Sequence, residues 1–152
     1  MSVLMKTGYV QFAPVIGEVR QTITKLDHLI RHAPPVDLLV LPELCNSGYN
    51  FASSQQARES SETVTDSVFL RYIMQFCIER NCHVVTGFNE RDGDTLYNSA
   101  ALVGPTGVRG IYRKLHLFYN EKEYFAPGDR GLPVFDIGVA QIGMLRQPIT
   151  LI

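Results

Sequence analysis

Tyr112-Arg113-Lys114-Leu115-His116-Leu117-Phe118 is the stretch that decides the fold, because an apolar run over residues 108–112 gives way there to polar residues. The pattern predicts a strand that ends at Lys114, then a loop that carries Glu121 and closes on the turn-forming Pro127-Gly128-Asp129. A second apolar run, Leu39-Val40-Leu41-Pro42-Glu43, also ends on a charged side chain. An ammonium and carboxylates near strand ends can polarise a carbonyl group and move its proton, so the candidate catalytic residues are Glu43, Lys114 and Glu121.

The N-terminal part of the chain predicts a βαβ unit. Residues 7–12 are rich in β-formers and stop before Pro14, and residues 18–32 place apolar side chains at helical spacing ahead of Pro34-Pro35. Residues 38–41 are four consecutive apolar positions, which is typical of a strand buried on both faces. A strand, a helix and a strand in this order predict that the two strands are parallel neighbours.

The remaining segments predict further helices and strands of one α/β domain. Residues 52–66 are polar and predict a surface excursion with one helical turn around residues 55–59. The expected elements after it are an amphipathic helix over residues 68–77, a strand over 83–88, a hairpin of 96–103 with 108–112, and strands over 134–137 and 139–145. The domain therefore begins with a parallel unit and continues with antiparallel strands.

Composition narrows the classes of function. The 152 residues are 45% hydrophobic and 19% charged, with a net charge of −1, which is ordinary for one globular domain. No basic block is present, which argues against nucleic acid or an anionic membrane as a partner. The apolar runs are shorter than the ~20 residues that a membrane helix needs, and no signal-peptide pattern opens the chain. An odd number of cysteines (Cys45, Cys77 and Cys82) favours reduced thiols and a cytoplasmic location.

Each candidate residue also has an ordinary explanation when it is taken alone. Glu43 could be a solvated glutamate in the loop after Pro42, and Lys114 could be exposed charge next to Arg113. Glu121 lies beside Lys122 and Glu123, and such charged clusters are usually wet surface.

Taken together, several short blocks in this spacing resemble the nitrilase superfamily of carbon–nitrogen hydrolases, and more narrowly its amidase and carbamoylase branches. The blocks are Leu41-Pro42-Glu43 with Gly48-Tyr49, Tyr97-Asn98-Ser99-Ala100, Tyr112-Arg113-Lys114-Leu115-His116-Leu117, and Asn120-Glu121-Lys122 through Phe125-Ala126-Pro127-Gly128-Asp129. The resemblance extends from Thr7 to Leu145, which is almost the whole chain.

The resemblance implies an α/β fold, a nitrilase-like α-β-β-α sandwich of which this chain supplies approximately the N-terminal half. It implies hydrolysis of non-peptide C–N bonds in small amides or N-carbamoyl compounds by a Glu-Lys-Cys triad, without a metal or organic cofactor, in a homo-oligomer. Glu43 would be the general base that activates the thiol, and Lys114 would stabilise the oxyanion of the tetrahedral intermediate. Glu121 would be the second carboxylate, which orients the lysine.

The chain departs from the family pattern at the nucleophile. Residues 139–145 follow the pattern of the strand that leads to the family's cysteine, but Gln147 stands at the expected cysteine position. A glutamine amide cannot form the thioester intermediate, and loss of a nucleophile costs on the order of a million-fold in turnover. We therefore expect this chain to be inactive. Cys45 is two residues from Glu43, but its thiol is expected to approach from the wrong strand.

The expected domain boundaries are a partial carbon–nitrogen hydrolase domain over residues 1–145 and a divergent tail over residues 146–152. Such a tail fits a splice product, a frameshift or a truncated gene model. An uncovered sheet face and unpaired strand edges predict a marginally stable monomer or self-association. One alternative function is a catalytically inactive half-domain that binds a partner or dimerises. Another is a flavodoxin-like ligand-binding domain, against which stands the single glycine in residues 13–17, where a phosphate loop would lie.

Overall fold

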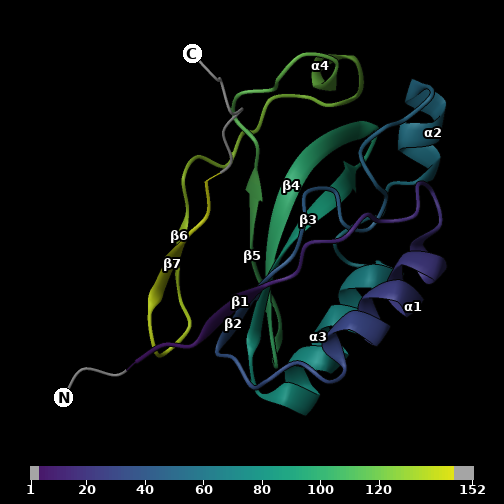
Figure 1. Cartoon of the computed structure of the whole chain (residues 1–152). Coiled ribbons are helices and arrows are strands. Elements are labelled where there is room, and N and C mark those ends of the chain that lie inside the picture. Colours follow the sequence, from purple (N-terminus) through teal and green to yellow (C-terminus); the bar gives the residue numbers. More distant parts are fainter. Residues whose placement is uncertain (1–3, 146–152) are drawn as a thin grey trace, which may run out of the picture.

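A five-stranded sheet lies at the centre of the computed structural model, which describes residues 4–145 (Figure 1). The sheet contains, in spatial order, β1 (Thr7–Tyr9), β2 (Leu38–Val40), β3 (His83–Asp92), β4 (Thr95–Gly104) and β5 (Gly107–Arg113). β1, β2 and β3 are parallel, and β4 is antiparallel to both β3 and β5. The carboxyl ends of β1, β2, β3 and β5 therefore lie at the same end of the sheet, where parallel-stranded α/β proteins place their functional groups.

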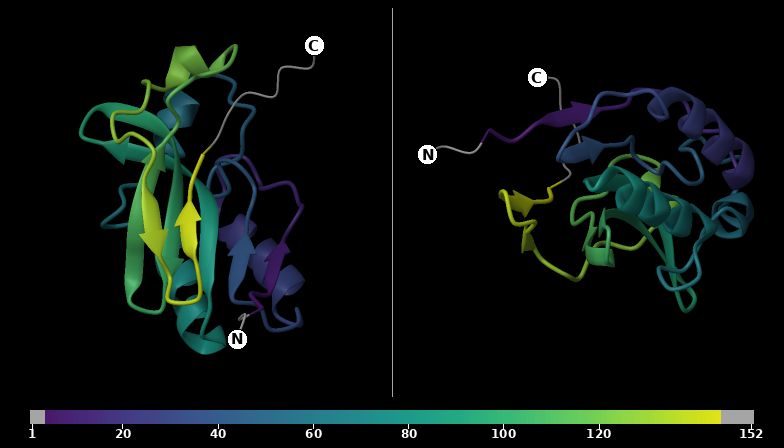
Figure 2. Two further views of the ribbon diagram at one scale, coloured as in Figure 1. Left: turned by 90° about the vertical axis from the view of Figure 1, so that its left-hand side faces the viewer. Right: turned by 90° about the horizontal axis from the view of Figure 1, so that it is seen from below.

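Two helices, α1 (Val19–Ile30) and α3 (Val68–Arg80), cover one face of this sheet (Figure 2, right). They bury an apolar cluster against the strands; among its members are Leu26, Ile30, Phe69, Ile73, Leu39, Val84 and Phe88. The removal of this apolar surface from water is the main driving force for packing the helices on the sheet.

The first turn of α3 is capped by two side chains that precede it in sequence. Ser67 Oγ accepts a hydrogen bond from the backbone N–H of Leu70 at 2.8 Å, and Glu62 Oε1 accepts one from the N–H of Val68 at 2.7 Å. These bonds satisfy backbone donors that the first turn of a helix leaves without partners. The helix stops at Asn81, whose φ of 49° is left-handed, so that β3 can begin at His83.

The other face of the sheet carries a short hairpin of β6 (Val134–Asp136) and β7 (Gln141–Gly143), as Figure 2 (left) shows. The contact with β5 is close, because a Cβ at Gly110 would lie 2.0 Å from the ring of Phe135. A hollow of about 440 Å³ remains between hairpin and sheet, lined by Val40, Val85, Tyr112 and Met144 among others. The described residues thus form a helical layer, the central sheet and the beginning of a second β layer.

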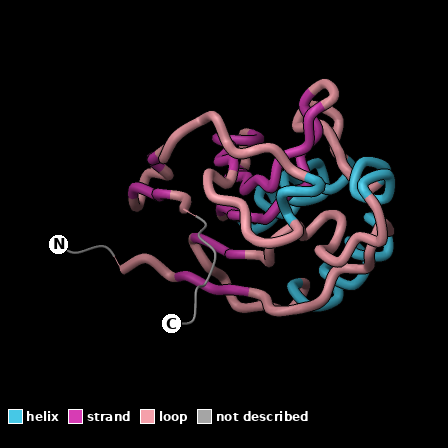
Figure 3. Tube along the Cα trace, turned by 90° about the horizontal axis from the view of Figure 1, so that it is seen from above, coloured by secondary structure: helices cyan, strands magenta, loops and turns pink. Residues whose placement is uncertain are grey.

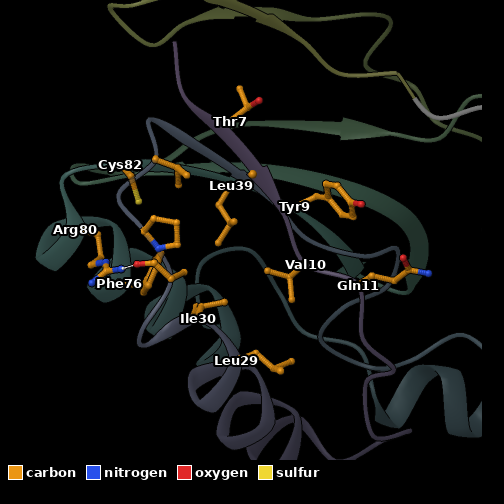
Figure 4. Close-up of a pocket in the computed structure, with 14 residues that line it drawn as sticks. Thr7, Tyr9, Val10, Gln11, Leu29, Ile30, Leu39, Phe76, Arg80 and Cys82 are labelled. Carbon is orange, nitrogen blue, oxygen red and sulfur yellow. Dashed lines mark hydrogen bonds between the residues drawn. The ribbon is translucent and has the colours of Figure 1, made fainter. Parts of the chain in front are cut away.

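A second hollow, of about 400 Å³, lies on the helical side of edge strand β1 (Figure 4). Its lining includes Tyr9, Leu29, Ile30, Phe76 and Cys82. It contains none of the three candidate catalytic residues.

The predicted parallel β1–β2 pair, both long helices and the hairpin of β4 with β5 are confirmed, and α2 (Ser54–Glu59) coincides with the predicted helical turn. Three features differ from expectation. β3 extends to Asp92 and pairs with β4 along its length, although residues 89–92 are polar. Residues 52–66 are not wholly at the surface, because Ala57 is fully buried. A short helix, α4 (Glu121–Tyr124), occupies the predicted loop after β5.

Candidate active site

The structure brings the three candidate catalytic residues together at the carboxyl end of the sheet. Lys114 Nζ lies 2.8 Å from both carboxylate oxygens of Glu121 and 3.3 Å from Glu43 Oε1. The side chains of Lys114 and Glu121 are 4% and 3% exposed, whereas that of Glu43 is 32% exposed. The ammonium and one carboxylate therefore lie in the interior, and the second carboxylate reaches toward solvent.

Lys114 is held by the strands on both sides of it. It directly follows β5, and its backbone N–H donates to the carbonyl of Asn98 on β4 at 2.9 Å, which continues the β4–β5 pairing by one residue. Its carbonyl accepts from the N–H of Gly128 at 2.9 Å, in the turn predicted from Pro-Gly-Asp. A Cβ at Gly128 would lie 2.1 Å from the carbonyl oxygen of Arg113, so this approach requires glycine. Figure 3 looks down on this end, where loops cover the strand ends.

Glu43 is placed by a close approach between its loop and β3. The N–H of Gly87 donates to the carbonyl of Pro42 at 3.0 Å, and the N–H of Cys45 donates to the carbonyl of Gly87 at 3.1 Å. A Cβ at Gly87 would lie 2.4 Å from the backbone of both Pro42 and Leu44. Leu44 is fully buried with a φ of 46°, a strained conformation that the surrounding packing maintains.

Glu121 accepts hydrogen bonds from three groups besides Lys114. The phenol of Tyr49 and the side-chain amide of Asn98 donate to Oε1, each at 3.0 Å, and the N–H of Phe118 donates to Oε2 at 2.7 Å. Burial alone would raise the pKa of the Glu121 carboxyl, but the hydrogen bonds from Lys114 and Phe118 outweigh it, so the pKa lies below its ordinary value. Glu121 is therefore an ionised carboxylate in the interior, with its charge compensated by the adjacent ammonium.

Comparison with known proteins identifies the family of this chain. Residues 6–146 match the family model described as carbon-nitrogen hydrolase. The chain belongs to the carbon–nitrogen hydrolase family.

Relatives in this family carry nitrilase and amidase names. The chain is 40% identical over 144 residues to a nitrilase of Pyrococcus abyssi, covering 93% of this chain and 55% of the relative. It is 34% identical over 158 residues to the protein N-terminal amidase of Schizosaccharomyces pombe, covering 97% of this chain and 54% of that relative. It is 28% identical over 136 residues to the N-carbamoylputrescine amidase of Arabidopsis thaliana, covering 84% of this chain and 45% of that relative. The chain thus spans about half the length of the curated relatives it matches.

Solved structures of the family share the fold. A crystal structure of N-terminal amidase with an Asn-Glu-Ala peptide superposes with a TM-score of 0.76 at 26% identity, over 86% of this chain and 33% of that one. A carbon–nitrogen hydrolase superfamily protein from Xanthomonas campestris, at 20% identity, superposes with a TM-score of 0.78. The superposition covers 91% of this chain and 51% of that one. The α/β fold is therefore that of the carbon–nitrogen hydrolases, and the described residues correspond to about half of it.

Arg113, the residue before Lys114, anchors a second buried charge cluster. Its guanidinium, 2% exposed, lies 2.6 Å from Glu90, 2.7 Å from Asp92 and 3.0 Å from Asp129, and it stacks 3.7 Å over the ring centre of Tyr97. Burial would lower the pKa of this guanidinium, but the hydrogen bonds to Glu90 and Asp92 raise it. The interpretation of Arg113 and Lys114 as exposed charge is therefore wrong, because both side chains are buried between carboxylates.

The three cysteines form no disulfide within the described residues, and all three are buried. Cys45 and Cys77 belong to the apolar cluster between the sheet and the helices. A hydrogen bond with Cys82, together with burial, raises the pKa of the Cys77 thiol, so it stays protonated.

Position 147, where the family pattern places the nucleophile and this sequence has glutamine, lies outside the described residues. Among residues 4–145, no cluster of three His, Cys, Asp or Glu is arranged to hold a metal ion, and no helix has the length and hydropathy of a membrane span.

Several residues around the site were not singled out by sequence reasoning. Asn98 and Tyr49 lie in blocks that carried the family resemblance, but nothing in the sequence indicated that they contact Glu121. Gly87 offered only a glycine within an apolar strand, which is a signal of close backbone approach.

The Glu121 carboxylate makes stability depend on pH. Because its folded-state pKa lies below the unfolded value of ~4.3, it stabilises the fold above that pH, and this contribution is lost as pH falls through the folded-state pKa. We expect Glu121→Gln to flatten the loss of stability as the pH falls below the unfolded value, measured by urea unfolding at a series of pH values. Glu123→Gln, in the exposed part of the same helix, is the matched control and should keep the wild-type slope. Equal slopes for both variants would contradict the ion pair.

Gly87→Ala should displace the loop that carries Glu43, because the added Cβ would fall 2.4 Å from its backbone. We expect stability to fall by ~1–3 kcal/mol, as for other overpacked sites, and NMR signals of Glu43 to move. Gly143→Ala is the control, since a Cβ there would meet its nearest atom, in Val134, at 3.9 Å; it should change stability by no more than about 0.5 kcal/mol. A Gly87→Ala variant as stable as the control would refute the close approach.

Proposed function

We propose that this chain supplies the acid–base and oxyanion-stabilising half of a carbon–nitrogen hydrolase site that acts on small amides or N-carbamoyl compounds. The observation that supports this most directly is the position of the Lys114 ammonium between the carboxylates of Glu43 and Glu121, at the carboxyl end of the sheet. The amidase names of the relatives support the substrate class.

The different exposure of the three side chains supports a division of roles. Glu43 is about one-third exposed and can reach a bound thiol or water, which suits a general base that removes its proton. The buried Lys114 ammonium lies beside it and offers a positive charge to the oxyanion that forms when the carbonyl carbon is attacked. Glu121 holds the Lys114 ammonium in place, because both of its carboxylate oxygens accept hydrogen bonds from Nζ.

In the proposed reaction Glu43 takes the proton of a thiol, and the resulting thiolate adds to the carbonyl carbon. The C–N bond then breaks as Glu43 passes the proton to the leaving nitrogen, which departs as an amine or ammonia and leaves a thioester. Water then hydrolyses the thioester to the acid and the free thiol. Lys114 would stabilise the oxyanion in both steps. We propose that none of Cys45, Cys77 and Cys82 is the nucleophile; Cys45 and Cys77 lie in the apolar cluster between the sheet and the helices. Gln147 occupies the position at which the family pattern has cysteine, so we propose that the 152-residue chain does not itself turn over substrate.

A second candidate function is a catalytically inactive module that binds a partner or dimerises. The observation that favours it is Gln147, which removes the family nucleophile from this sequence. Under this candidate the charge cluster has a structural role, and joining this chain to a functional nucleophile would not produce catalysis.

The test joins residues 1–145 to the part of the Pyrococcus abyssi nitrilase that follows its matched segment, which by family resemblance carries the cysteine. We expect this chimera to release ammonia from small aliphatic amides or N-carbamoyl amino acids, and to be inactivated by thiol alkylation. Glu43→Gln and Lys114→Met should each lower turnover by about 10²–10⁴-fold, the usual contribution of a proton-transferring or oxyanion-stabilising group. The 152-residue chain should release none.

Glu123→Gln and Lys122→Met are the matched controls in the chimera, because both side chains are exposed on α4; they should leave turnover unchanged. A folded chimera that hydrolyses neither class of substrate would contradict the proposed function and favour the inactive module. Thiol-sensitive ammonia release by the 152-residue chain would contradict its proposed inactivity.

A further inference from the structure

Asn98, near the start of β4, contacts all three candidate catalytic residues. Its side-chain Nδ2 donates to Glu43 Oε1 at 2.6 Å and to Glu121 Oε1 at 3.0 Å. Its backbone carbonyl accepts from the N–H of Lys114 at 2.9 Å. One residue of β4 therefore joins the segment after β2, which is 55 residues away in sequence, to the segment after β5 and the short helix α4.

The orientation of the Asn98 amide follows from the groups around it. Both atoms that face it are carboxylate oxygens, which can only accept, so the NH₂ group must point toward them. Its Oδ1 is buried without a hydrogen-bond partner among the described residues. Burial of such an oxygen is unfavourable, so the stabilising contribution of this side chain comes from its two donated hydrogen bonds.

The Asn98 NH₂ group lies between two negatively charged carboxylates. Glu43 and Glu121 share the single ammonium of Lys114, and Oε1 of both carboxylates lies within 3.0 Å of the same Asn98 nitrogen. Two carboxylates this close repel each other and favour protonation of one of them. A neutral NH₂ group between them offers one hydrogen to each, which offsets their repulsion and fixes their separation.

We propose that Asn98 is a positioning residue of this site: its side-chain amide bridges Glu43 and Glu121 and so holds the Glu43 carboxylate beside Lys114. The inference rests on the proposed function, in which Glu43 acts as the general base. The bridging geometry itself belongs to the folded chain and can be measured without turnover.

Asn89 provides a matched comparison for a purely structural asparagine. It lies directly opposite Asn98 in the antiparallel β3–β4 pairing, is equally buried, and also has an Oδ1 without a partner among the described residues. Its Nδ2 donates to the carbonyl of Ala57 at 2.8 Å rather than to a carboxylate. Removal of either amide should destabilise the fold, but only removal of the Asn98 amide should change the titration of the Glu121 carboxyl.

The experiment follows the Glu121 carboxyl by ¹³C NMR during a pH titration of the 152-residue chain and its variants, with melting temperatures in parallel. We expect Asn98→Leu to move the Glu121 titration to higher pH, because the carboxylate loses a donor and faces Glu43 without the bridge. Asn98→Asp, nearly the same shape, should move it further, because a third carboxylate replaces the donor. Asn89→Leu should lower the melting temperature and leave the titration at its wild-type position.

The proposal is overturned if Asn98→Leu or Asn98→Asp leaves the titration unchanged, or if Asn89→Leu moves it equally. Loss of the folded spectrum in both Asn98 variants, with Asn89→Leu still folded, would likewise assign Asn98 a structural role only. The result is separable from the ammonia assay. An unmoved titration with an active chimera refutes the positioning role alone, whereas a moved titration with an inactive chimera refutes the proposed function alone.

Discussion

The buried ion pair of Lys114 with Glu121 is the interaction on which the arrangement of this end of the molecule depends. An ammonium that is 4% exposed would be strongly destabilising without compensation, because burial removes its hydration. Here both oxygens of Glu121 and one of Glu43 surround it. The short helix α4, the loop after β2 and the turn at Gly128 can therefore be understood as the segments that bring these partners to a lysine fixed by β5.

Arg113 extends the same principle to the neighbouring residue. Two consecutive cations at the end of β5 are buried, and each has its own carboxylates: Glu90, Asp92 and Asp129 for Arg113, and Glu43 and Glu121 for Lys114. Hydrogen bonding to Arg113 lowers the pKa of the Asp92 carboxyl. Because removal of one partner would leave an uncompensated buried charge, the two clusters lock the end of β5 against β3 and the turn at residues 127–129.

The sequence allowed prediction of those features that depend on local pattern. Both long helices, the parallel pair β1–β2, the β4–β5 hairpin and the proximity of three charged residues at strand ends followed from periodicity, turn residues and family resemblance. The polar end of β3 could not be predicted, because the partners of the buried Glu90 carboxylate, Ser99 and Arg113, lie on other strands. The contacts of Asn98 and Gly87 were missed for the same reason, since their partners are known only once the chain is folded.

The charged half of the site is assembled by a limited part of the chain. The hydrogen bonds that place Lys114, Glu121 and Glu43 join residues between Pro42 and Gly128. All of these residues belong to the five-stranded sheet, to α4 or to the loops at their ends. The contacts that hold the ion cluster together therefore all lie within residues 42–128. The arrangement of Glu43, Lys114 and Glu121 can therefore be studied by itself, since it depends on backbone and side-chain contacts within this part of the fold.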